Sequence, residues 1–168
     1  MSLSYEIQPV ETVAVATEGP PGARAFFIEA AGGGERVTLG CEKFQVQGLV
    51  TRIHEALEAR SESLPALEEN VRPFPTPTGP LLAAWDAAEL GLGFHESKSM
   101  FVIVAREMTE DPEPAVARFW TTPAQARAFT VQAQEVLAGG RQICTHCGLP
   151  IDPAGHPCPA RNGSRPII

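Results

Sequence analysis

The sequence predicts an α+β fold built from antiparallel β-meanders and two amphipathic helices. The 168-residue chain is 43% hydrophobic and 20% charged, which is ordinary for a globular protein. Its sixteen prolines and fifteen glycines favour many turns and short strands. Two segments also carry an apolar stripe with the period of an α-helix. These three observations together predict the fold class.

The first strands are predicted at residues 11–17, 24–30 and 36–39, where Val, Thr and Phe gather between turn residues. Three consecutive glycines, 32–34, lie between the second and third of these strands. They predict a hairpin rather than a phosphate-binding loop, because no Gly-Lys-Ser/Thr follows and no helix begins there. A helix comes next, with its apolar stripe at Val46, Leu49, Val50, Ile53 and Leu57.

A proline-rich linker over residues 61–80 separates this half from a second one. Strands are predicted there at residues 81–85, 92–95, 100–105 and 115–120. The second helix has a clear start, with Thr122 as N-cap, Pro123 in the first turn and Gln125 completing a capping box. Gly139 and the glycine after it end this helix.

The two helices carry the same stripe at an offset of 80 residues. Each helix also follows a predicted meander, and Gln125 stands where the first helix has Gln45. We therefore predict an α+β body over residues 1–140, with pseudo-repeats at 1–60 and 80–140. Chance similarity between two amphipathic helices is the competing explanation.

Residues 141–168 are predicted to form a small zinc knuckle with Cys144, Cys147, His156 and Cys158 as ligands. Two thiolates three residues apart reach one ion at about 2.3 Å, and the glycine after the second one allows the turn. Thiolate and imidazole donors favour zinc over hard cations. Four protein ligands leave no open coordination position, so the predicted site is structural rather than catalytic.

Other interpretations of this cluster were weighed. A Cys144–Cys147 redox pair is disfavoured because such motifs open a helix after a strand, whereas this one follows a helix end. His146 competes with His156 for the fourth ligand position, but its place between two ligating cysteines would strain the chelate. The choice between the two histidines stays open.

Charge argues against a nucleic-acid footprint over the whole surface, since the formal net charge is −7. The segment 139–168 is the exception: three arginines and one aspartate give it about +2, leaving about −9 on the remainder. Candidate anion or partner contacts are Arg141, Arg161 and Arg165 in this segment, and Arg24 beside a Gly/Pro turn. For Arg24 the simpler interpretation is an exposed hairpin arginine.

The chain resembles an uncharacterised bacterial family, domain of unknown function 3090, which is best known in actinobacteria. The resemblance lies in residues 17–24, 26–27, 42–46, 84–86 and 122–129, and above all in the closing Cys-x-x-Cys-Gly-x-Pro-x-Asp-Pro-x-Gly-His-x-Cys-Pro. Two departures are Ser164, where the family usually has an aromatic residue, and Arg161, one place later than the usual arginine. The resemblance implies intact metal ligands and no known activity.

No catalytic motif with diagnostic spacing is recognisable in the sequence. The leading hypothesis is a cytoplasmic, non-enzymatic zinc-binding adaptor that presents the knuckle to a protein partner. The alternatives are an enzyme or small-molecule-binding domain with a pocket between the two halves, and nucleic-acid binding through the arginines of the knuckle. No membrane role is expected, since no secretory signal is recognisable at the N-terminus and no apolar run approaches the roughly 20 residues of a membrane span.

Overall fold

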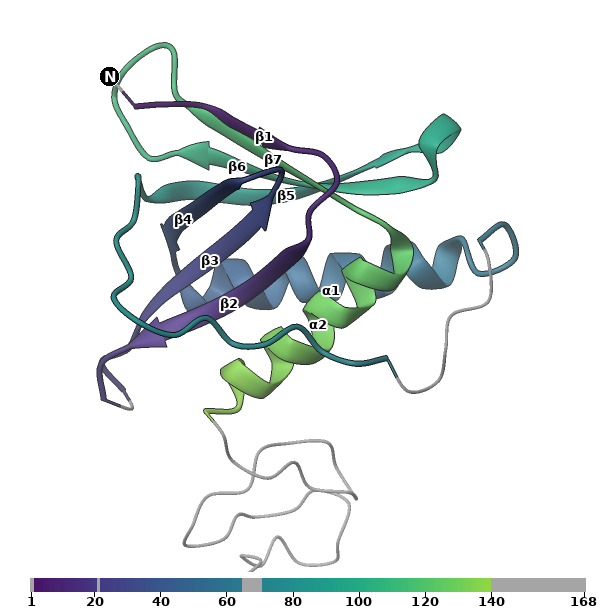
Figure 1. The fold of residues 1–168 in the computed structure, drawn as a ribbon, viewed down its shortest axis with the longest axis horizontal. Coiled ribbons are helices and arrows are strands. Elements are labelled where there is room, and N and C mark those ends of the chain that lie inside the picture. The colour runs from purple at the N-terminus through teal and green to yellow at the C-terminus, as the bar shows by residue number, and fades with distance from the viewer. Residues whose placement is uncertain (1, 21, 65–70, 140–168) are drawn as a thin grey trace, which may run out of the picture.

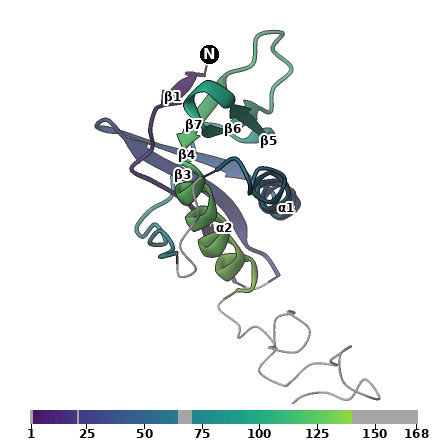
Figure 2. The same cartoon turned by 90° about the vertical axis from the view of Figure 1, so that its right-hand side faces the viewer.

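The computed structural model describes residues 2–20, 22–64 and 71–139, and it has the α+β architecture that the sequence predicts. A four-stranded sheet and a three-stranded sheet share one core with two crossing helices (Figure 1, Figure 2). The elements in chain order are β1 (Tyr5–Ile7), β2 (Thr12–Glu18), β3 (Ala25–Gly32), β4 (Glu35–Cys41), α1 (Lys43–Ala59), β5 (Ala87–His95), β6 (Met100–Glu107), β7 (Val116–Thr121) and α2 (Pro123–Leu137), with one 3₁₀ turn between β5 and β6.

Both predicted meanders are present as antiparallel hairpins. β2, β3 and β4 form the three-stranded sheet, and β5, β6 and β7 form the larger sheet with β1 added at its edge. The glycine hairpin is confirmed: β3 ends at Gly32, and the turn residues Gly33 and Gly34 have φ of 60° and 83°. Such positive φ values are readily available only to glycine, so the turn depends on these residues.

The sequence missed one strand, and one predicted strand was wrong. Strand β1 was not predicted, and it makes the larger sheet mixed because it pairs in parallel with β7 (Tyr5 opposite Ala117). The predicted strand at residues 81–85 is not one. Its chain runs beside β4, where the amide of Ala84 donates to the carbonyl of Thr38 and the amide of Gly40 donates to the carbonyl of Trp85. The segment therefore lies along the edge of β4, in the same way that β1 lies along the edge of β7.

The two meanders bury matching residues toward the helices. Phe26, Ile28 and Ala30 of β3 are buried, and Phe101, Ile103 and Ala105 of β6 repeat them in the same order. Their partners on the next strand also correspond, with Phe26 opposite Cys41 and Phe101 opposite Thr121, each one residue before a helix N-cap. The order and the register of the strands are therefore the same in the two halves.

Each helix is tied to the start of the antiparallel meander of the other half, β5 or β2, by a glutamine in its first turn. The Gln45 amide nitrogen donates to the carbonyls of Ala87 and Ala88 at 3.1 and 2.9 Å, at the start of β5. The Gln125 amide nitrogen donates to the carbonyl of Val10 at 2.8 Å, just before β2. Both side-chain oxygens also accept the amide of the N-cap residue, which confirms the capping box predicted for α2.

As a result, α1 lies on β5 and α2 lies on β2, and the helices pack against one another. The proline-rich connection between the halves contains no helix or strand in the parts that are described, 61–64 and 71–80. No helix among the described residues is long and apolar enough to cross a membrane. Each helix thus packs on a strand of the opposite half. The two contacts, α1 with β5 and α2 with β2, are the parts of the described body where polar side chains of interest lie.

Candidate functional site

The predicted zinc ligands Cys144, Cys147, His156 and Cys158 lie outside the described residues, as do His146, Arg141, Arg161 and Arg165. The structure accordingly leaves the zinc prediction as a prediction. Within residues 2–20, 22–64 and 71–139, no group of three or more His, Cys, Asp or Glu side chains is placed to hold a metal ion.

Arg24 is the one predicted contact residue that the structure describes, and it is half-buried. Its Nη1 donates to the carbonyl oxygen of Val136 at 3.0 Å, and its guanidinium carbon lies 5.0 Å from the centroid of the Phe26 ring. A cation that binds a last-turn carbonyl also interacts favourably with the helix dipole. Arg24 therefore joins the start of β3 to the end of α2.

A hollow of about 370 Å³ lies between α1 and the outer part of the β5–β6 hairpin. It is lined by Arg52, Glu55, Ala56, Arg60, Leu92, Gly93, Phe94 and Phe101. We call it the α1–β5 hollow. Its helix residues come from the first half of the chain and its strand residues from the second, so it is a pocket between the two halves. Its volume falls at the lower end of the range of ligand sites.

Two guanidinium groups and one carboxylate, that of Glu55, line the α1–β5 hollow, so the arginines leave it with an excess of positive charge. Arg52 is exposed, and its Nη1 donates to the carbonyl oxygen of Leu90 at 2.8 Å. Arg60 is half-buried, and its guanidinium carbon lies 4.3 Å from the centroid of the Phe94 ring. Among the described residues, neither arginine has a carboxylate within ion-pair distance. Both keep N–H donors suited to a carboxylate or phosphate.

The corresponding junction between α2 and β2 is closed, and we call it the α2–β2 junction. Gln132 is buried there; its side-chain oxygen accepts the Val15 amide at 2.8 Å and its nitrogen donates to the Val15 carbonyl at 2.7 Å. The same nitrogen lies 3.1 Å from the hydroxyl of Thr76, which belongs to the proline-rich connection. Phe74, two residues earlier, packs against the core. An extended stretch of the chain thus covers this junction.

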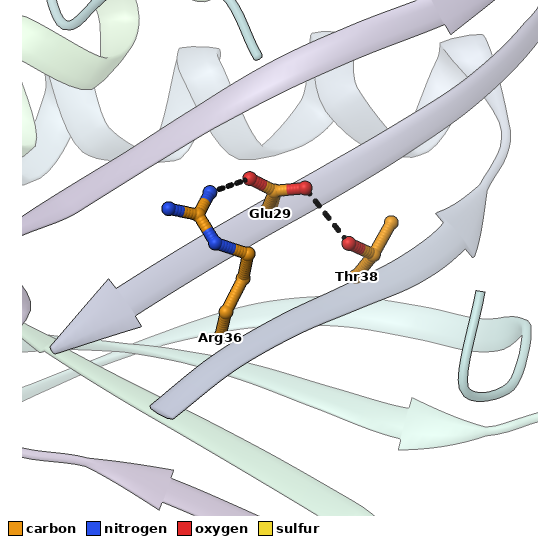
Figure 3. Close-up of polar contacts among 3 residues, drawn as sticks. All are labelled: Glu29, Arg36 and Thr38. Atoms are coloured by element: carbon orange, nitrogen blue, oxygen red, sulfur yellow. Dashed lines mark hydrogen bonds and ion pairs between the residues drawn. The ribbon is translucent and has the colours of Figure 1, made fainter. Parts of the chain in front are cut away.

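Glu29 on β3 belongs to another polar group, in which side chains of the neighbouring strand β4 neutralise its charge (Figure 3). Its carboxylate forms an ion pair with Arg36 and accepts a hydrogen bond from the hydroxyl of Thr38 at 2.9 Å. Thr38 is the cross-strand partner of Glu29 on β4. Only 11% of the Glu29 side chain is exposed, so its two partners satisfy a carboxylate that water barely reaches. The group is structural.

The described cysteine, Cys41, packs against the core at the end of β4, as its apolar surroundings in the sequence suggest. Burial raises the pKa of its thiol to about 12, and the negative charges of Glu42 and Asp86 add to the effect. At neutral pH the thiol is protonated, and a protonated thiol is a poor nucleophile. Cys41 is therefore unsuited to covalent chemistry.

Sequence reasoning did not single out Arg52, Arg60 or Phe94. The available signal was weak: Arg52 lies off the apolar stripe of its helix and resembles a solvated position, and Arg60 directly follows the last helical residue, where it continues the spacing of the stripe with a charged side chain. Phe94 and Arg60 are 34 positions apart in the sequence, and only the packing of α1 on β5 brings them together.

Comparison with known proteins gives a family and no activity. No curated protein and no solved structure matches the chain. One family model matches residues 5–158, which include every helix and strand of the described body and the cysteine and histidine cluster. The family is described as one of proteins of unknown function, DUF3090, and the match confirms the resemblance found in the sequence. This protein belongs to the DUF3090 family.

Proposed function

We propose that the protein is a zinc-binding module in which residues 141–168 fold around one structural Zn²⁺. The observation that carries this proposal is the donor set: three cysteines and a histidine with the spacing Cys144, Cys147, His156, Cys158. Three thiolates and one imidazole suit Zn²⁺ and complete its tetrahedron, so the ion would hold the segment together and would not activate water. Such a segment has few apolar residues of its own and would depend on the metal for its fold.

The proposed role is that of a cytoplasmic, non-enzymatic adaptor that binds a protein partner. Support comes from the closed donor set, which leaves no coordination position for a substrate. A second support is the α1–β5 hollow, where two guanidinium groups form no ion pair with a described residue although the net charge of the chain is −7. A binding role accounts for both features.

We further propose that the body arose by internal duplication of a three-strand-and-helix unit, with copies in residues 1–60 and 80–140. The matching order of elements supports this origin. So do the repeated Phe-x-Ile-x-Ala pattern of β3 and β6 and the paired glutamines Gln45 and Gln125. Two unrelated units would have no reason to share these details in register.

Zinc content tests the metal proposal directly. Elemental analysis of the purified full chain should give about one zinc per molecule. Cys147→Ser should lose most of it, whereas Cys41→Ser, which removes the half-buried thiol of β4, should keep it. His156→Ala and His146→Ala form a matched pair, and only the former should release the ion. A zinc ratio well below one for the unmodified protein would refute the proposal.

Thiol reactivity gives a second reading of the same site. At pH 8 the zinc-loaded protein should react slowly with a thiol reagent at every cysteine, since three are metal-bound and Cys41 is protonated. A chelator should release three fast-reacting thiols and leave Cys41 slow. Four fast thiols before chelation would contradict the zinc site.

The adaptor role is tested by capture from native lysate of the organism that makes the protein. The wild type should enrich a defined partner, and Cys147→Ser should lose it if the partner is bound by the zinc segment. Enrichment of nothing by either protein would count against an adaptor.

A further inference from the structure

The two helix–strand junctions share one framework, which allows the open one to be interpreted from the closed one. At the end of α1, Arg60 lies over Phe94 and Phe101, 4.3 and 6.0 Å from their centroids, and its Nη1 is 3.4 Å from the carbonyl of Ala56. At the end of α2, Arg24 lies over Phe26 and donates to the carbonyl of Val136. The end of each helix therefore has the same arrangement: an arginine that lies over a phenylalanine ring and contacts a carbonyl oxygen of the last helical turn.

What differs is the cover. The α2–β2 junction is overlaid by the proline-rich connection, whose Thr76 reaches Gln132 and whose Phe74 packs against the core. No described residue covers the α1–β5 hollow in that way, and Leu92 and Phe94 remain half-exposed at its floor. The protein itself therefore shows which kind of chain fits such a junction: an extended, proline-containing segment with an aromatic side chain.

Charge distinguishes the segment that the open junction would accept. Gln132 of α2 and Arg52 of α1 occupy equivalent helix positions, 80 residues apart. The neutral amide at the closed junction is thus replaced by a cation at the open one, and Arg60 adds a second guanidinium group. Eight helical residues separate the two arginines, which is about 12 Å along the axis. An extended chain covers that length in about four residues. Two carboxylates about four residues apart would meet both guanidinium groups.

We propose that the α1–β5 hollow binds an extended acidic peptide segment of a partner protein. Its carboxylates would pair with Arg52 and Arg60, and an apolar side chain between them would pack on Leu92 and Phe94. This proposal rests on the proposed binding role and names the class of partner, but it does not depend on the zinc segment.

The test uses the full chain, labelled with ¹⁵N and with its zinc content measured by elemental analysis, and a synthetic probe. The probe is acetyl-Asp-Pro-Phe-Pro-Asp-amide, and its neutral match carries Asn in place of both Asp residues. Amide shifts of α1 and β5 should move saturably with the acidic probe. The neutral probe should bind roughly tenfold more weakly, because the charge-assisted bonds are lost.

Variants locate the site. Combining Arg52→Gln with Arg60→Gln should weaken the acidic probe by roughly tenfold. Glutamine is the residue that already fills the first position in α2, so the change preserves the helix. Arg127→Gln removes one exposed charge from α2, which contributes no residue to the lining of the hollow, and should leave binding unchanged.

Three outcomes would overturn the proposal. They are equal binding of the neutral probe, equal loss in Arg127→Gln, or saturable binding of phenyl phosphate in the hollow without binding of the peptide. The last would make the hollow a small-anion site. Because zinc content is measured on the same sample, a zinc-loaded protein that ignores the peptide would refute the hollow alone, and a zinc-free protein that binds it would refute the metal alone.

Discussion

The α2–β2 junction and the α1–β5 hollow are two versions of one arrangement, in which a helix lies on the first strand of the opposite half. In the closed version the tethering side chain is Gln132, which is 1% exposed and bonded to both the amide and the carbonyl of Val15. In the open version it is Arg52, which is exposed and makes one bond, to the Leu90 carbonyl.

The difference follows from the cost of burying a charge. A guanidinium under the proline-rich connection would lose its hydration without gaining a counter-charge, whereas a neutral amide can satisfy all its partners there. Where the surface is open to water, arginine carries no such cost and brings spare donors. The closed junction contributes to stability, and the open one keeps the guanidinium donors on which the proposed peptide binding depends.

The largest effect on this comparison should come from Gln132→Leu. The substitution leaves the buried amide and carbonyl of Val15 without partners, at a cost of about 1–3 kcal/mol each, so we expect the free energy of unfolding to fall by about 3 kcal/mol. Urea denaturation measures it. The matched variant Arg52→Leu removes a single bond, to the Leu90 carbonyl at the open junction, and should cost under about 1 kcal/mol. Equal losses would remove the distinction between the two junctions.

An intermediate effect is expected from the two first-turn glutamines. Gln45→Ala and Gln125→Ala each remove a cap and an inter-half tether. Because Gln45 is buried and donates to two carbonyls while Gln125 is half-exposed and donates to one, we expect losses of about 2 and about 1 kcal/mol. Thermal or urea unfolding of both variants checks the ranking. A larger loss at Gln125 would show that exposure does not govern these tethers.

The smallest effect should come from Thr76→Val, which keeps the shape of the side chain and removes its hydroxyl. Gln132 still donates to Val15, so the loss of unfolding free energy should be about 0.5 kcal/mol. Hydrogen exchange of the Val15 amide should quicken slightly if the connection lifts. Thr78→Val, two residues along at an exposed position, is the control and should change neither quantity.

Much of the fold could be predicted because its signals are local. Thr122, Pro123 and Gln125 predict the start of α2, and three consecutive glycines predict the β3–β4 hairpin. Gln45 and Gln125 could even be matched across the halves before their shared tethering role was visible. Each of these patterns depends on residues within one turn of one another.

The misses depend on distant contacts. β1 has only three residues, and its pairing with β7 joins Tyr5 to Ala117 across most of the chain. The segment 81–85 has the composition of a strand, but it makes only isolated bonds beside β4. The α1–β5 hollow has the same origin, since Arg60 and Phe94 meet only after α1 has packed on β5. The periodicity of a sequence carries no information about contacts between residues that are far apart in the chain.

The exchange of helices between halves also has a consequence for the order in which the protein is made. When residues up to the end of α1 have left the ribosome, β5, which α1 will cover, has not yet emerged from it. The apolar side of β2, including Val13 and Val15, likewise waits for α2, the last helix of the body. The first half of the nascent chain therefore exposes apolar surface to water until α2 is complete. The two halves of the body consequently fold as a single unit.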